Sequence, residues 1–138
     1  MKISQIQPGI DELKVVLEIG FLLCDRGRLE DAARVFQGAA ELMPSSEVPW
    51  VGLAKVYLQC GHYAEAQAAC EEGLTRQPES LYARVHRAEA LLFQQQSEEA
   101  RRELENILTL APDSAEGRTA ASLLDLAEVI SRGNPASL

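Results

Sequence analysis

The side chains that could carry chemistry in this chain of 138 residues are few, and they do not combine into a catalytic pattern. Neither histidine, His62 or His86, has a cysteine or a second histidine at the spacing of metal ligands. The adjacent carboxylates of Glu71 and Glu72 would point in different directions on a helix, whereas acid–base catalysis requires carboxylates that converge. The sequence also lacks a glycine-rich phosphate loop and a nucleophile elbow. We therefore expect a protein that is not an enzyme and that holds no metal or cofactor.

The cysteines do not indicate a disulfide framework or a metal site. Cys24, Cys60 and Cys70 are odd in number and lack paired spacing. Free cysteines are commonly buried, so we interpret all three as small core residues, with Cys24 the one that has access to solvent.

Charge and hydropathy restrict the partners and the compartment. The formal net charge is −8, and nucleic-acid binding requires clustered Lys and Arg, so we expect no nucleic-acid partner. The N-terminus has no apolar segment of signal-peptide length, and the longest apolar stretch, residues 21–24, is far shorter than a membrane span. These features predict a cytoplasmic protein without membrane contact.

The elements that position these residues follow a fixed repeat. Prolines at 44, 78 and 112 and alanines at 32, 66 and 100 each recur at an interval of 34 residues. An interval near 34 is typical of stacked helix-turn-helix units, each of which buries its apolar face against its neighbours. We therefore predict an all-α solenoid whose surface binds another protein.

The middle repeat carries the fullest motif. It reads Trp50-x2-Leu53-Ala54-x2-Tyr57, followed by Ala66-x3-Cys70 and a closing proline at 78. This pattern resembles the tetratricopeptide repeat. The resemblance implies a right-handed α-solenoid of three helix-turn-helix repeats with a concave groove, followed by a capping helix.

The repeat phase sets the expected domain organisation and the helices. We expect an N-terminal segment at 1–12, repeats at 13–46, 47–80 and 81–114, a capping helix at 115–131 and a disordered tail at 132–138. The expected helices span 11–25, 29–42, 48–59, 63–75, 80–94, 98–110 and 115–130. Gly27 and Gly61 stand where the first helix of a repeat ends, a position that favours positive φ. Gln95 replaces this glycine in the third repeat, so we expect a looser or longer turn there.

The first helix of each repeat carries a stripe that the packing motif does not use, at spacings of three and four residues. In tetratricopeptide repeats this stripe lines the groove. The predicted partner-binding residues are Leu17, Phe21, Cys24, Val48, Val51, Lys55, Leu58, Tyr82, Val85, Glu89, Leu92 and Phe93. Most of them are apolar, and large exposed apolar patches mark interaction sites.

Three occupants of this groove remain open. A partner segment with apolar anchors, either a peptide or a helix, is the functional interpretation. The chain's own Ile3, Ile6 and Ile10 would instead complete the core. A second copy of the protein is the third alternative, so a homodimer or a small heterocomplex stays open.

The resemblance excludes one activity and suggests another. Co-chaperones of this family grip a C-terminal carboxylate with Lys, Asn and Arg, but the matching positions here are Leu17, Phe21, Gly52, Tyr82 and His86, which cannot form such charge-assisted bonds. In size and repeat number the chain is similar to type III secretion chaperones. That resemblance implies a groove that holds a hydrophobic secreted substrate before export. The alternative is a permanent adaptor or scaffold subunit of a multiprotein assembly.

Overall fold

Seven stretches of helix-forming sequence, separated by short turns, fold into seven α-helices in the computed structural model, which describes residues 9–133. They are α1 (Ile10–Asp25), α2 (Leu29–Leu42), α3 (Val48–Gln59), α4 (Tyr63–Arg76), α5 (Leu81–Phe93), α6 (Ser97–Leu110) and α7 (Ala115–Gly133). The described residues contain no strand. The predicted all-α fold is therefore confirmed, and every helix lies where the repeat phase placed it.

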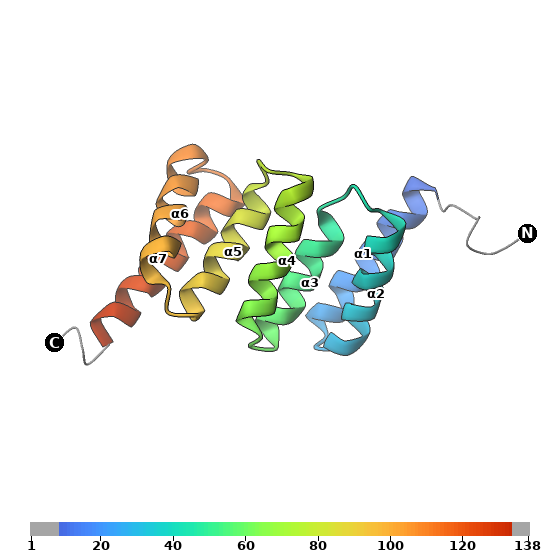
Figure 1. Ribbon diagram of the computed structural model, residues 1–138, viewed down its shortest axis with the longest axis horizontal. Helices are drawn as coiled ribbons and strands as arrows, with labels where there is room; N and C mark the ends of the chain where they lie inside the picture. Colours follow the sequence, from blue (N-terminus) through green and yellow to red (C-terminus); the bar gives the residue numbers. More distant parts are fainter. Residues whose placement is uncertain (1–8, 134–138) are drawn as a thin grey trace, which may run out of the picture.

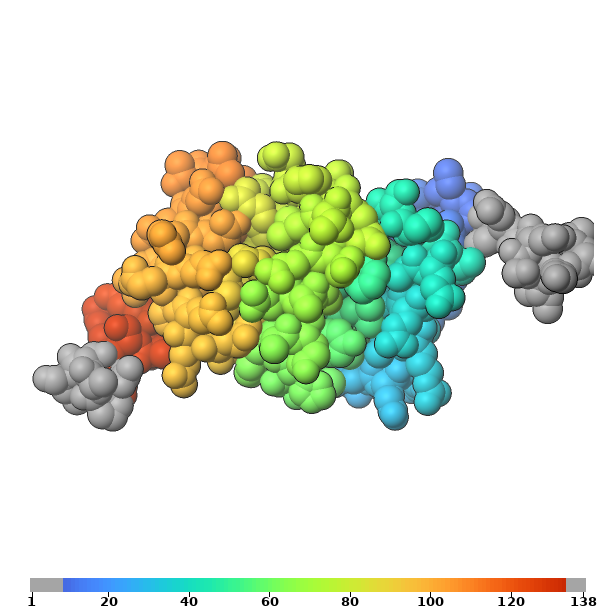
Figure 2. Space-filling view, in the orientation of Figure 1, coloured from blue at the N-terminus to red at the C-terminus, as the bar shows by residue number. Residues whose placement is uncertain are grey.

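The helices form two layers that run the length of the molecule. The first helices of the repeats, α1, α3 and α5, contact one another, and α7 continues this layer by packing on α5. The second helices, α2, α4 and α6, contact the flanking first helices but, within residues 9–133, not each other. Figure 1 shows this succession, with α1 and α7 at opposite ends of the solenoid. Figure 2 views the second-helix side, where α2, α4 and α6 cover most of the surface.

The three repeats turn from first to second helix in the same way. Gly27 and Gly61 adopt φ of 75° and 76°, and Gln95 adopts φ of 65°. In each turn an N–H donates back to a carbonyl oxygen five residues earlier: Arg28 to Leu23 at 2.9 Å, His62 to Tyr57 at 2.8 Å and Gln96 to Leu91 at 3.0 Å. The expected looser turn at Gln95 is therefore wrong, because the glutamine takes the left-handed conformation that glycine takes elsewhere.

The N-terminal half of the core is built around Phe36, which is fully buried on α2. A β-carbon on Gly20 of α1 would lie 2.7 Å from its ring, and one on Gly52 of α3 would also overlap it. The ring thus fills the space between three helices that only glycine leaves open. The C-terminal half has its own cluster, in which α5 residues pack with Leu104, Ile107 and Leu123 of α6 and α7.

The last helix is longer than predicted, whereas the first begins within one residue of its predicted start. α1 begins at Ile10, next to the predicted start at 11, and α7 runs to Gly133, beyond the predicted end at 130 and into the expected tail. The Gly117 N–H donates to Ser114 Oγ at 2.9 Å, which fixes the start of α7. The rest of the expected tail, 134–138, lies outside the described residues, and the repeat boundaries stay predictions.

Candidate partner-binding face

Side chains from α1 and α3 meet on the side of the first-helix layer that faces away from the second helices. Lys55 Nζ lies 5.6 Å from the centre of the Phe21 ring, a cation–π contact, and 3.3 Å from Asp25 Oδ1. Phe21 also meets the buried Phe36 ring edge-on at 4.9 Å between centroids, so the core fixes its orientation. The Phe21 ring and the Lys55 side chain stay half-buried. These two predicted residues therefore share one face.

Helix α5 adds Tyr82 and His86 to that face. Their rings meet edge to face with centroids 4.7 Å apart. Burial lowers the pKa of His86, nearby Lys55 lowers it further and Glu116 acts in the opposite direction, so the site favours the neutral imidazole. Burial raises the pKa of Tyr82, with Lys55 acting in the opposite direction. The charge of Lys55 on α3 thus reaches both α5 side chains. Leu58 follows Lys55 by one turn on α3, and Glu89 follows His86 by one turn on α5. We call Phe21, Lys55, Leu58, Tyr82, His86 and Glu89 the first-helix face.

Glu89 is the one residue of the first-helix face that carries an unpaired charge. Its side chain is half-buried, and no hydrogen bond or ion pair joins it to another residue within 9–133. Burial raises the pKa of this carboxyl, because the charged form loses solvation. Lys55 does not offset this loss, since its ammonium group pairs with Asp25. The face thus combines aromatic and aliphatic surface with one free carboxylate.

Four of the predicted groove residues are buried and offer a partner almost no surface. Cys24, Val51, Val85 and Leu92 are between 0% and 2% exposed. Val51 packs toward Gly73 of α4 and Ala83 of α5, whereas Val85 and Leu92 belong to the C-terminal core cluster. The helices that follow each of these positions along the solenoid cover them, and for Val85 and Leu92 these are α6 and the capping helix α7. The expectation that these side chains line an open groove is corrected accordingly.

The remaining predicted residues are at least partly accessible. Leu17, Val48 and Leu58 are half-buried. Phe93 is 40% exposed, but it stacks on Tyr63 at the start of α4 with ring centroids 5.0 Å apart, so this chain already covers one side of its ring. Whether these side chains bind a partner stays a prediction.

The structure changes two further expectations about accessibility. Cys60, at the end of α3, is the exposed cysteine, while Cys24 and Cys70 are buried. Ile10 is 75% exposed at the start of α1, so it does not fill a groove. Ile3 and Ile6, which share that prediction, lie outside the described residues.

Two further surfaces, which the sequence analysis did not assign to partner binding, also carry apolar side chains. On α1, Val15, Ile19 and Leu22 are between 45% and 52% exposed at the N-terminal edge of the solenoid. Their i, i+4, i+7 spacing was the available signal. On the second-helix side, Trp50, Leu53 and Tyr57 line two shallow crevices of about 230 and 380 Å³ beside α2 and α4. The Arg76 guanidinium lies 4.8 Å from the centre of the Trp50 ring and covers part of it.

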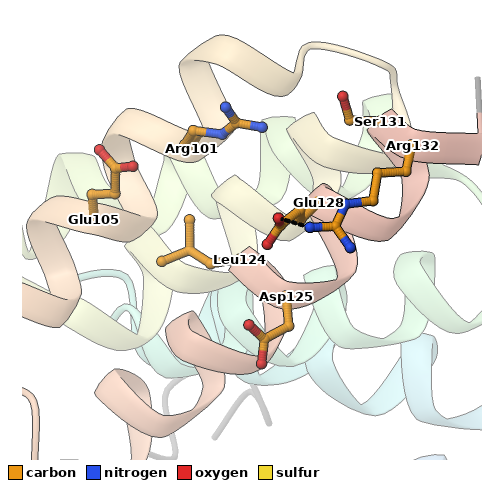
Figure 3. Close-up of a pocket in the computed structure, with 7 residues that line it drawn as sticks. All are labelled: Arg101, Glu105, Leu124, Asp125, Glu128, Ser131 and Arg132. Carbon is orange, nitrogen blue, oxygen red and sulfur yellow. Dashed lines mark hydrogen bonds and ion pairs between the residues drawn. The ribbon is translucent and has the colours of Figure 1, made fainter. Parts of the chain in front are cut away.

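A charged crevice of about 510 Å³ lies between α6 and α7 (Figure 3). Arg101 and Glu105 of α6 face Leu124, Asp125 and Glu128 of α7 across it. Its cations are already paired, because Arg132 NH2 lies 2.5 Å from Glu128 Oε1 and Arg101 NH1 lies 3.9 Å from Glu98 Oε1. We therefore interpret this crevice as ordinary charged surface, because its side chains do not converge on one point.

Metal and membrane sites receive no support from the geometry. Within the described part of the chain, no group of three or more His, Cys, Asp and Glu side chains is placed to hold a metal ion. None of the helices between residues 9 and 133 combines the length and apolar character that crossing a bilayer requires.

Comparison with known proteins identifies the repeat. A family model described as tetratricopeptide repeat matches residues 23–87 and again 61–124. Among curated proteins, anaphase-promoting complex subunit 3 of Schizosaccharomyces pombe is 29% identical over 97 residues, which are 70% of this chain and 15% of that protein. The chain therefore spans only a small part of that relative.

Two solved structures show how closely the fold is shared. The first tetratricopeptide domain of Spaghetti (RPAP3), bound to the HSP90 peptide SRMEEVD, has a TM-score of 0.77 and 21% identity, covering 93% of this chain and 99% of that one. The Yersinia enterocolitica type III secretion chaperone SycD, in complex with a peptide of the translocator YopD, has a TM-score of 0.74 and 23% identity, covering 88% and 95%. At these identities the likeness establishes the fold.

Proposed function

Because this chain belongs to the tetratricopeptide repeat family, we propose that it binds a segment of a partner protein across its first-helix face, without catalysis. The observation that carries the proposal is a stripe of accessible side chains from α1, α3 and α5: Phe21 lies under Lys55, Leu58 follows Lys55 by one turn, and Tyr82 packs on His86. Stacked repeats create extended surfaces that hold a peptide or helix through spaced apolar anchors.

The finer form of the proposal is a type III secretion chaperone that holds a hydrophobic secreted substrate in the cytoplasm. The chain's length and three repeats support it, and so does the similarity to SycD, which was solved with a translocator peptide. The substrate would leave the face at export.

A second candidate is a permanent adaptor or scaffold subunit, and the relative in the anaphase-promoting complex favours it. The exposed stripe of Val15, Ile19 and Leu22 on α1 would then adjoin another subunit or further repeats. The two candidates differ in the lifetime of the complex. A chaperone exchanges its substrate, whereas an adaptor retains its partner.

The first test places a charge on the first-helix face. Leu58→Glu should weaken partner binding on the order of tenfold to a hundredfold, because burying one such side chain contributes about 1.5–3 kcal/mol. The matched control is Leu110→Glu, the same change at a residue of α6 that is 61% exposed. The measurement is recovery of partners from the native cell by wild type and both variants, with helicity checked by circular dichroism.

The outcomes separate the alternatives. Loss of a partner with Leu58→Glu and its retention with Leu110→Glu supports the proposal. Equal recovery by all three proteins contradicts it and directs attention to the crevices beside Trp50. For a recovered partner, exchange against added free protein within minutes indicates a chaperone, and no exchange indicates a fixed subunit.

A further inference from the structure

The charges on α5 divide sharply between its two sides. Arg84 Nε lies 2.5 Å from Glu103 Oε1, and Arg87 bridges Glu71 of α4 at 2.9 Å and Glu99 of α6 at 3.2 Å. The arginines of α5 are therefore neutralised by the second-helix layer. Glu89 lies on the same helix, yet no cation within the described residues reaches it.

A second group of carboxylates lies where the first-helix face reaches the α4–α5 turn. A crevice of about 370 Å³ there is lined by Tyr82 together with Glu47, Glu79 and Glu116. One oxygen of Glu47, Oε2, is buried and has no hydrogen-bond partner among the described residues. Tyr82 belongs to both the crevice and the first-helix face. Carboxylates from the segment before α3, from the α4–α5 turn and from α7 therefore surround the Tyr82 end of the first-helix face.

A docked apolar segment would remove the remaining water from Glu89. Burying a carboxylate without a partner is strongly unfavourable, whereas a cation delivered by the ligand compensates for the lost solvation. Such a pair contributes mainly to selectivity, because a ligand that lacks the cation leaves the carboxylate stranded. The face is thus better matched to a basic segment than to a purely apolar one.

We propose that the partner segment of this protein carries a lysine or arginine among its apolar anchors, and that this cation pairs with Glu89. The proposal rests on the proposed function, because it specifies the ligand of the same face. Glu116 and the carboxylates around Tyr82 attract the same basic segment at longer range. Lys55 does not repel it strongly, since Asp25 neutralises its ammonium group.

The experiment uses a library of random dodecapeptides displayed on phage, selected on the full chain. Peptides enriched on wild type should combine spaced apolar residues with a Lys or Arg at a constant position relative to them. Glu89→Gln keeps the shape of the side chain. Selection on this variant should lose the preference for a basic residue and keep the apolar spacing. The matched control is Glu105→Gln, an exposed residue of α6, which should enrich the same peptides as wild type.

A soluble peptide then tests the pairing directly. An enriched peptide and its analogue with norleucine in place of the lysine are titrated by fluorescence anisotropy. The replacement should weaken binding on the order of tenfold to wild type and leave binding to Glu89→Gln nearly unchanged, as expected for two groups that interact. An equal effect on both proteins overturns the pairing with Glu89.

The selection also separates this inference from the proposed function. Peptides that are lost on Leu58→Glu require Leu58. If these peptides carry no enriched basic residue, the inference is overturned and the proposed function stands. If no selected peptide depends on Leu58, both proposals fail.

Discussion

The aromatic ring of Phe36 lies directly against the backbone of Gly52, where a β-carbon would overlap the ring. Gly52 is one of the positions that a carboxylate-binding member of the family would use for ligand contact. Here its role is to admit the side chain around which α1, α2 and α3 pack. This contact joins the first two repeats and supports the Phe21 end of the first-helix face.

Gly52→Ala should therefore destabilise the protein by about 1–3 kcal/mol, because the added methyl group overpacks the core. Thermal unfolding followed by circular dichroism measures the effect. The control is Gly38→Ala on α2, where a β-carbon meets nothing within 4 Å. That change should be neutral or stabilise by about 0.5–1 kcal/mol, since alanine favours helix. An unchanged melting temperature for Gly52→Ala would show that the ring has room to move.

Gln95→Gly should stabilise the third repeat. A left-handed conformation costs a non-glycine residue about 1–2 kcal/mol, and the backbone entropy of glycine offsets about 0.5–1 kcal/mol of that gain. We expect a net stabilisation of roughly 0.5–1 kcal/mol, seen as a rise of a few degrees in the melting temperature. The reciprocal change Gly61→Gln, at φ of 76° with open space around its β-carbon, should destabilise by a similar amount. If both changes are neutral, the turns relax more easily than the shared hydrogen bonds indicate.

The three cysteines should react at very different rates. Burial raises the pKa of Cys70 to about 12 and also raises the pKa of Cys24, so neither forms the reactive thiolate at neutral pH. Cys60 is exposed. Iodoacetamide labelling with mass spectrometry should modify Cys60 alone in the native protein and all three cysteines after denaturation. Native labelling of Cys24 as fast as that of Cys60 would mean that α1 separates from α3 in solution.

Glu89→Gln should raise the stability of the free protein at neutral pH. Because the folded state raises the pKa of Glu89 above its ordinary value of 4.5, the ionised carboxylate destabilises the fold above that range. As the pH falls through the folded pKa toward 4.5, the carboxylate takes up a proton and this penalty disappears. Melting temperatures of the two proteins should therefore differ near pH 7 and converge below 4.5. A difference that does not change with pH would assign the effect to packing rather than to charge.

The C-terminal carboxylate of a peptide should contribute nothing to binding at the first-helix face. Leu17 and Phe21 are apolar, burial lowers the pKa of His86, and the ammonium group of Lys55 already pairs with Asp25, so a terminal carboxylate finds no free charged donor. Titration calorimetry with SRMEEVD, the peptide bound by the Spaghetti domain, should show no saturable heat. Its C-terminal amide should behave identically. Tight binding of the acid form alone would contradict the predicted absence of a carboxylate clamp.

The sequence by itself determined the helices, their order and their stacking. A repeat of 34 residues places small side chains such as Ala32, Ala66 and Ala100 at the same point of each unit, and all three are fully buried. Close helix packing depends on this local pattern of small and large residues, which is visible in one repeat and strengthened by its recurrence. The tight turn at Gln95 was not predicted, because the hydrogen bonds that join the two flanking helices impose its left-handed conformation.

The tertiary structure alone decided which stripe residues stay accessible. Helical periodicity places Val51, Lys55 and Val85 on the same side of their helices, yet only Lys55 keeps contact with solvent. Burial depends on which neighbour lies above each residue, and those neighbours come from α4, α5 and the C-terminal core. The free charge of Glu89 has the same origin. The sequence shows that cations are nearby, and only the packing shows that Arg84, Arg87 and Lys55 pair elsewhere.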